Sequence, residues 1–254
     1  MQTFIDSYLF VENGGQFLLL SLVIVIAGIV RGCIGFGFSA ILVASTSFWL
    51  PPVAVVNLAV LMEIGASVMM SVSIQKDVKT AVLIPLTLGT LLTSFIGTWL
   101  LATLSDAQLQ WIIGPYLVVI ALLTLTNYQF PGEVTSLRIF FLGLVSGFFN
   151  GLAAIGGIVA AWGLVGSKLP VRDIRATLAA YFIVVEILFL LAAYWNGIMT
   201  LGVILTAVFS LIPLALGIWL GARLFNRYPE ALLKRLVLIA LISLSLLGLY
   251  KTIF

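Results

Sequence analysis

The chain has no histidine, one cysteine and very few charged side chains. Without histidine, the usual histidine-containing zinc sites, Ser-His-Asp triads and histidine proton shuttles are excluded. Cys33 alone can form no internal disulfide and no metal or redox motif built on a cysteine pair. The chain also lacks a GxxxxGKS or GxxxxGKT loop, which an ATPase of the P-loop class would need. We therefore expect no enzymatic activity, no metal and no other cofactor.

Charged residues make up only 8% of the 254 residues, whereas hydrophobic residues make up 63%. A soluble domain carries about a quarter charged residues, so this composition excludes a water-soluble globule. Six apolar runs approach or exceed the roughly 20 residues that cross a bilayer core of about 30 Å. These runs are residues 53–74, 81–104, 109–128, 176–195, 201–222 and 236–254. The sequence predicts an all-α polytopic membrane protein in a lipid bilayer, with no basic patch for nucleic acid.

Two further apolar stretches are interrupted in the middle by glycine-rich segments. RGCIGFGFS interrupts residues 17–50, and NGLAAIGG interrupts residues 139–165. Each flanking piece has about 11 to 16 residues, or roughly 16 to 24 Å of helix, which is shorter than the hydrocarbon core. We expect each stretch to form a hairpin of two short helices that leaves and returns on the same side of the membrane.

The basic residues favour one orientation of these segments. If the N-terminus is extracytoplasmic, ten of the twelve Lys and Arg residues fall on the cytoplasmic side, and only Arg31 and Lys251 lie elsewhere. The positive-inside rule predicts this asymmetry. No Lys or Arg precedes Arg31, so the amino terminus lacks the basic region of a cleavable signal peptide. Both termini are expected to be extracytoplasmic.

The two halves of the chain resemble each other at a shift of 120 residues. IGTWLLATL at 96–104 lies over LGIWLGARL at 216–224, and the match pairs Trp99 with Trp219. Each half has one broken-helix hairpin and three transmembrane helices, so the second half enters from the opposite side. Inverted repeats of this kind recur in secondary transporters, which bind substrate between the halves. The expected N-terminus, first repeat, cytoplasmic linker and second repeat are residues 1–15, 16–128, 129–137 and 138–254.

The two breaks are candidate anion sites. Backbone groups that lose their helical partners are tolerated in a membrane only where protein or water satisfies them. A helix that begins near Phe38 or Ile158 would aim free N–H groups and its positive dipole end at the interior, which suits an anion. Alternatively, the glycines only let helices pack closely, as in many membrane bundles. The presence of a break in both halves favours the anion site.

Polar residues and glycines near the breaks form the candidate substrate site. The guanidinium of Arg31 matches the oxygens of a carboxylate or sulfonate, although Arg31 could instead mark the cytoplasmic end of a full span. Arg175 could steer anions or only signal topology, and the hydroxyls of Ser39 and Thr177 could bond within their own helices. The candidate residues are Arg31, Gly35, Gly37, Ser39, Asn57, Asn150, Gly156, Gly157, Arg175 and Thr177.

Glu63 and Glu186 lie near the middle of two predicted spans, at nearly repeat-related positions. An ionised, unpaired carboxylate at that depth costs on the order of several kcal/mol, so each should be protonated, paired or exposed to water. We expect this pair to couple transport to protons. The alternatives are a structural ion pair, such as Glu63 with Arg31, and a neutral carboxyl that is hydrogen-bonded to a neighbouring helix.

The stretch SKLPVRDIRATLAAYFIVVE, preceded by NGLAAIGG, resembles the TauE/SafE family of membrane proteins, and GFGFSAILVASTSFWLPPVAVVNLA looks like a weaker first-half copy. The resemblance covers essentially the whole chain as two repeats. It implies a secondary transporter in a bacterial inner membrane, in the export direction, for small anions such as sulfite, sulfonates or carboxylates. Alternating access, with protons as a candidate coupling ion, is the mechanism that the resemblance and the inverted repeat favour together.

This sequence departs from the usual family pattern in its first copy, at Phe36, Phe38 and Asn57. The size and polarity of the site could therefore differ, and the particular anion stays open, as does the oligomeric state. Two other classes of function remain as alternatives. One is an anion channel, and the other is a non-transporting assembly or sensor subunit.

Overall fold

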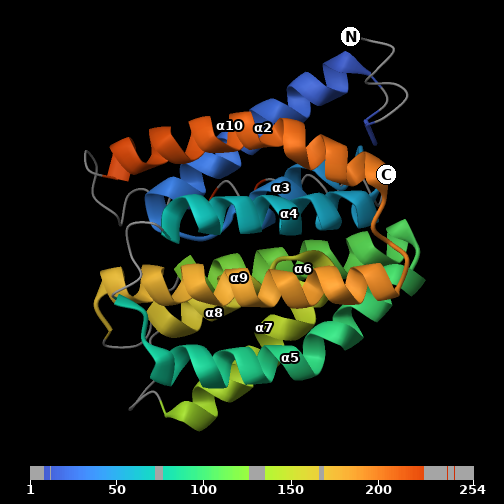
Figure 1. Cartoon of the computed structure of the whole chain (residues 1–254). Helices are drawn as coiled ribbons and strands as arrows, with labels where there is room; N and C mark the ends of the chain where they lie inside the picture. The colour runs from blue at the N-terminus through green and yellow to red at the C-terminus, as the bar shows by residue number, and fades with distance from the viewer. Residues whose placement is uncertain are drawn as a thin grey trace.

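The computed structural model describes residues 9–11, 13–71, 77–125, 135–165 and 169–225, together with residues 239 and 243. In these residues the secondary structure is entirely helical, as Figure 1 shows. The helices are α2 (Gly14–Ile34), α3 (Phe38–Thr46), α4 (Pro52–Ser71), α5 (Thr80–Thr103), α6 (Asp106–Leu125), α7 (Ser136–Ala153), α8 (Gly156–Val165), α9 (Val171–Trp195) and α10 (Leu201–Phe225).

The prediction of an all-α polytopic membrane protein is confirmed. Six of the described helices are long and apolar enough to cross a membrane, namely α2, α4, α5, α7, α9 and α10. The predicted span at 236–254 lies outside the described residues except for residues 239 and 243, as do most of the predicted linker at 129–137 and residues 1–8 of the predicted N-terminus.

Local hydrogen bonds explain where several helices begin. The side chain of Asn13 accepts a hydrogen bond from the backbone N–H of Gln16 and so caps α2. Thr135 caps α7 in the same way, through the N–H of Arg138. Before α6, the backbone N–H of Ser105 donates to the side chain of Gln108, a capping-box arrangement that starts a new helix directly after α5.

Each half of the chain packs mainly against the other half. In Figure 1, α2 lies against α10 on one side of the molecule and α5 against α7 on the other, with α4 and α9 between these pairs. The N-terminal part of α4 meets the end of α9, because Asn57 donates to the carbonyl of Ile198. Conversely, the hydroxyl of Thr177 near the start of α9 accepts from the backbone N–H of Lys79, which follows α4.

The helices α4 and α9 are therefore antiparallel. The other two closely packed pairs also join the halves of the chain, because α2 packs against α10 and α5 packs against α7. Related helices of an inverted repeat would run in opposite directions in this way. The inverted repeat itself stays a prediction, since these contacts fit such a repeat without demonstrating its symmetry.

Helical winding stops within both glycine-rich segments, as the sequence predicts. Gly35 and Gly37 adopt the left-handed backbone conformation, with φ of 86° and 89°, and so turn the chain from α2 into α3. In the second half, Ala154 takes this conformation, with φ of 56°, between α7 and α8. The glycines Gly156 and Gly157 lie inside the first turn of α8.

The expected length of the hairpin arms is wrong for the first arm of each pair. Helix α2 has 21 residues and α7 has 18, so both are long enough to span, whereas only α3 and α8, with 9 and 10 residues, are short. Winding continues past Arg31 and Asn150 because both side chains find partners in the protein interior. A polar side chain that makes hydrogen bonds inside the protein in this way does not force the helix to end.

Close glycine contacts join the paired helices. Gly28 and Gly32 of α2 face Gly217 and Gly221 of α10, and a methyl group on Gly32 would collide with the carbonyl oxygen of Ile218. Helices α5 and α7 meet through a similar set, Gly89, Gly97, Gly143, Gly147 and Gly151. For Gly32 and Gly151, the alternative that glycines serve close helix packing therefore applies, because small residues allow two helix backbones to approach closely.

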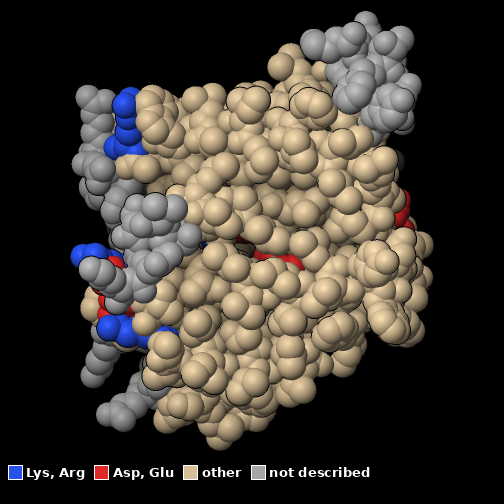
Figure 2. Space-filling view, in the orientation of Figure 1, with Lys and Arg blue, Asp and Glu red and all other residues tan. Residues whose placement is uncertain are grey.

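Lys and Arg side chains gather at one end of the molecule, as Figure 2 shows, and little charge appears on this face between the two ends. Two ion pairs lie at the start of α9, Lys79 with Asp173 at 3.1 Å and Arg172 with Asp77 at 2.6 Å. Large hydrophobic side chains such as Ile212 are exposed along the middle of the helices. This distribution suits a protein surrounded by lipid.

We expect Gly151→Ala to destabilise the protein by about 1–3 kcal/mol, because the added methyl group would collide with the Ser94 carbonyl and force α5 and α7 apart. The apparent melting temperature of the detergent-purified protein measures this effect. Gly15→Ala is the matched control, since a methyl group there meets only the side chain of Asn13 at 3.2 Å. Equal stability of the two variants would contradict the tight α5–α7 contact.

Candidate functional site

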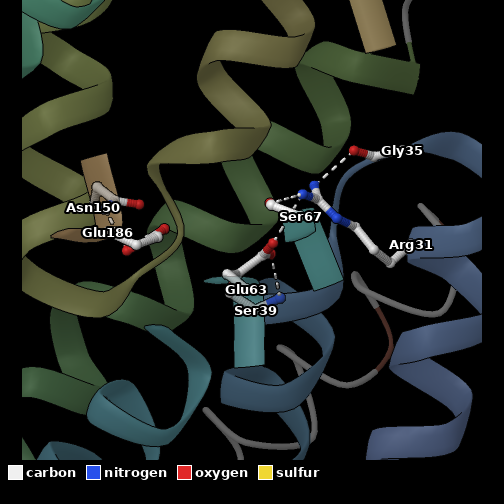
Figure 3. A network of polar contacts seen from close by, with 7 residues as sticks. All are labelled: Arg31, Gly35, Ser39, Glu63, Ser67, Asn150 and Glu186. Carbon is white, nitrogen blue, oxygen red and sulfur yellow. Dashed lines mark hydrogen bonds and ion pairs between the residues drawn. The ribbon is translucent and has the colours of Figure 1, made fainter. Parts of the chain in front are cut away.

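Arg31, in the last turn of α2, is completely buried. Its Nη1 donates to the carbonyl oxygen of Gly35 at 2.6 Å, and its Nη2 donates to the hydroxyl of Ser67 at 2.8 Å, as Figure 3 shows. Nη2 also lies 3.2 Å from Oε2 of Glu63 on α4. The guanidinium carbon is 4.3 Å from the centre of the Phe182 ring on α9. Arg31 has no exposed surface, yet it lies in the last turn of a helix long enough to span, so the alternative that it marks the end of a full span stays open.

Glu63 is held by donors from two directions. Its Oε1 accepts hydrogen bonds from the hydroxyl of Ser39 at 2.6 Å and from the backbone N–H of Ser39 at 3.3 Å, and its Oε2 faces Arg31. Ser39 lies in the first turn of α3, where free N–H groups and the helix dipole favour a negative charge. The start of α3 therefore does face an anion, and that anion is the carboxylate of the protein itself.

The ion pair between Glu63 and Arg31, one of the alternatives drawn from the sequence, is thus present. Together these residues form what we call the Arg31 cluster, which consists of Arg31, Gly35, Ser39, Glu63 and Ser67. It joins the tip of the first hairpin to α4, and the stacked ring of Phe182 extends it to α9 in the second half.

A second, smaller group lies at the second hairpin. The side-chain amide of Asn150 donates to Oε2 of Glu186 at 3.2 Å (Figure 3). Both residues are buried, and within the part of the chain that the structure describes neither Oε1 of Glu186 nor the amide oxygen of Asn150 has a hydrogen-bond partner. We call these two residues the Glu186 pair. Asn150 lies in the last turn of α7, just as Arg31 lies in the last turn of α2, so the helix before each break ends with a polar side chain that contacts a buried carboxyl group.

A buried hydroxyl network, which the sequence did not reveal, supports the second hairpin. The phenol of Tyr181 lies 2.7 Å from the hydroxyl of Thr90 and 2.8 Å from that of Ser146. Ser146 in turn donates to the carbonyl oxygen of Gly156 at 2.8 Å. This network fixes the start of α8 against α5 and α9.

Phe182 and Ser67 were also missed. Ser67 follows Glu63 by one helical turn, and that spacing could have identified it as a second polar residue on the same face of α4. Phe182 offered no signal, because its contact with Arg31 depends on how α9 packs against α2. A methyl group on Gly157 would collide with the Phe182 ring, so this glycine makes room for the ring.

The remaining predicted residues lie elsewhere. Asn57 donates to the carbonyls of Val53 and Ile198, and Thr177 accepts from Lys79. Arg175 donates to the carbonyl of Gly32 at 3.2 Å, where its positive charge suits the C-terminal end of α2. Asn57 and Thr177 therefore bind other partners, whereas Arg175 lies against Gly35 at the edge of the Arg31 cluster.

Among the buried residues that the structure describes, three have ionisable acidic or basic side chains of the Arg, Lys, Asp or Glu type: Arg31, Glu63 and Glu186. Figure 2 shows red acidic atoms at the bottom of a narrow opening in the middle of the apolar face. Glu63 is 1% exposed and Glu186 is 0% exposed, so water has almost no contact with either side chain. The described residues include no group of three His, Cys, Asp or Glu side chains that could hold a metal ion.

Comparison with known proteins identifies the family. The sequence model of the family described as Sulfite exporter TauE/SafE matches residues 20–248, nearly the whole chain. No curated protein and no solved structure matches the chain. The resemblance inferred from the glycine-rich breaks and the Arg-Ala-Thr step at residues 175–177 is confirmed. With a buried cation beside broken helices and a family match over nearly its whole length, the chain belongs to the TauE/SafE family of membrane transporters.

Proposed function

We propose that the protein is a secondary transporter of small organic or sulfur-containing anions, such as sulfite, sulfonates or carboxylates, and that it works as an exporter by alternating access. The family supports a sulfur-containing anion as cargo. The observation that carries the proposal is Arg31, a fully buried guanidinium at a helix break, in contact with residues from both halves of the chain.

The donors that hold Glu63 are suited to a substrate anion. The guanidinium of Arg31, the Ser39 hydroxyl and the Ser39 N–H already bind two carboxylate oxygens. A sulfite, sulfonate or carboxylate ion presents oxygens with similar spacing and charge, and a guanidinium binds such groups in a planar, two-pronged fashion. The substrate would therefore compete with Glu63 for the same donors. Nε of Arg31, which is buried without a hydrogen-bond partner, offers one further donor.

The packing of the helices supports alternating access. Glycine contacts hold α2 firmly to α10 and α5 firmly to α7, so each pair can move as a unit. Helices α4 and α9 lie between these units and carry Glu63 and Glu186. A rocking of one unit against the other would open the Arg31 cluster to one side of the membrane at a time. In this scheme the buried carboxyls Glu63 and Glu186 couple the anion to protons.

We expect sulfite, methanesulfonate or acetate to raise the apparent melting temperature of the wild-type protein, since a ligand present at 100 times its dissociation constant stabilises by about 2.7 kcal/mol. Arg31→Lys keeps a positive charge beside Glu63 but loses the planar fork, so it should weaken anion binding about tenfold. Arg223→Lys is the matched control, because Arg223 lies in the last turn of α10, against Trp219 and away from the cluster.

Flux of labelled sulfite in proteoliposomes separates the alternatives. A transporter gives saturable flux that Arg31→Lys impairs and Arg223→Lys leaves intact. Flux through a continuously open path, with no saturation, would favour the anion channel. The absence of both flux and stabilisation for every anion in the wild-type protein would leave the assembly or sensor subunit as the better explanation. Equal loss of binding in both variants would remove Arg31 from the site.

We also propose an inner-membrane location with the charged end of α9 in the cytoplasm, as the distribution of basic residues favours. In a Cys33→Ala background, a membrane-impermeant maleimide applied to spheroplasts should label Ala107→Cys, which is exposed after the α5–α6 turn. Lys79→Cys, which is exposed at the opposite end of α5, should react only after permeabilisation. The reverse pattern would invert the proposed orientation.

A further inference from the structure

We propose that the two buried carboxyls have different roles: Glu186 carries the exchangeable proton, and Glu63 is the ionised counter-ion of Arg31 as long as no substrate anion occupies the Arg31 cluster. This inference rests on the proposed proton-coupled transport and assigns the coupling within it. Both side chains are buried, but Glu63 and Glu186 have different hydrogen-bond partners. The inference follows from this difference.

Glu63 has the surroundings of a carboxylate. The Arg31 guanidinium faces Oε2 at 3.2 Å, and Oε1 accepts from the Ser39 hydroxyl at 2.6 Å and the Ser39 N–H at 3.3 Å. All of these neighbours are donors, and one of them carries a full positive charge. An added proton on Glu63 would weaken each of these contacts and leave Arg31 buried without its counter-ion, which is strongly unfavourable.

Glu186 has the surroundings of a neutral acid. Among the described residues, its one hydrogen bond comes from the uncharged amide of Asn150, at 3.2 Å, and its Oε1 has no partner there. The side chain is 0% exposed, so water does not compensate a charge on it in this conformation. A buried carboxylate without a cationic partner is far more costly than a protonated carboxyl group.

The charged groups around Glu186 lead to the same assignment. Arg31 of α2, Glu63 of α4 and Tyr181 of α9 are the ionisable groups that act on it electrostatically. Helices α5 and α8 contain no charged residue, and the only one in α7 is Arg138 in its first turn, far along the helix from Asn150. Arg31 and ionised Glu63 balance each other, so one proton on Glu186 makes this interior electrically neutral.

Asn150 can support both states of Glu186, which makes it a positioning residue. Its amide N–H group donates to a carboxyl oxygen whether or not the carboxyl carries a proton, and its unpartnered amide oxygen can accept the carboxyl O–H. Release of the proton requires water to reach Glu186, which is closed off here. Proton exchange is thereby tied to the opening of the second hairpin during the transport cycle.

Infrared spectroscopy of the reconstituted protein tests the assignment without depending on transport. At neutral pH, the wild-type spectrum should contain the C=O stretching band of a protonated, deuterium-sensitive carboxyl group. Glu186→Gln should abolish this band, whereas Glu63→Asp, which keeps a carboxylate on α4 as the counter-ion of Arg31, should retain it. Asn150→Ala should shift the band while keeping its area, because it removes the hydrogen bond to Glu186. Retention of the band in Glu186→Gln would overturn the inference.

Transport measurements supply the second readout. In proteoliposomes with labelled sulfite, Glu186→Gln should lose accumulation driven by a pH gradient, at least tenfold below wild type, yet keep exchange of sulfite for sulfite. Accumulation in Glu186→Gln at the wild-type level would contradict its role in coupling, even if the infrared band is present. If the wild-type protein shows the band on Glu186 but moves no sulfite, sulfonate or carboxylate, the proposed function fails while the protonation assignment stands.

Discussion

The buried ion pair between Arg31 and Glu63 is the constraint on which the rest of the interior depends. A guanidinium with no exposed surface requires a carboxylate and neutral acceptors around it, and here α4 supplies Glu63 and Ser67 while the chain turn supplies the carbonyl of Gly35. That carbonyl is available because the helix ends just beyond Arg31. The ion pair and the break in α2 therefore stabilise each other, and neither would be tolerated alone in an apolar interior.

Glycine has two separate uses in this fold, and they explain how a broken helix can stay ordered. Gly28, Gly32, Gly217 and Gly221 bring α2 and α10 into backbone contact, which anchors the first hairpin from outside. Gly35 and Gly37 instead adopt the left-handed conformation and turn the chain inward. The glycine contacts hold α2 against α10, and the left-handed conformation of Gly35 and Gly37 then turns the chain. Together these features place the start of α3 against Glu63 while α2 stays packed against α10.

Much of the fold, and part of the site, could be predicted from the sequence. Apolar runs long enough to cross a bilayer predict the spans α4, α5, α9 and α10, and RGCIGFGFS and NGLAAIGG predict the two breaks, because composition and glycine content act locally. The extent of α2 and α7 could not be predicted, since it depends on tertiary partners for Arg31 and Asn150. The same limit applies to Phe182 and Tyr181, which resemble ordinary core aromatics until packing brings them to Arg31 and Ser146. Asn57 and Thr177 are polar residues of the predicted kind whose partners only the fold supplies.

The difference between the halves matters more for the proposed function than their likeness. If α7 carried a cation where α2 has Arg31, each half would contain a charge-balanced ion pair, and no buried group would gain from exchanging a proton. Asn150 at this position leaves Glu186 with one neutral donor and an unpartnered oxygen. The two hairpins thus lie beside two buried carboxyl groups with different surroundings. The site centred on Arg31 is suited to an anion, and the site centred on Glu186 is suited to the proton that accompanies it.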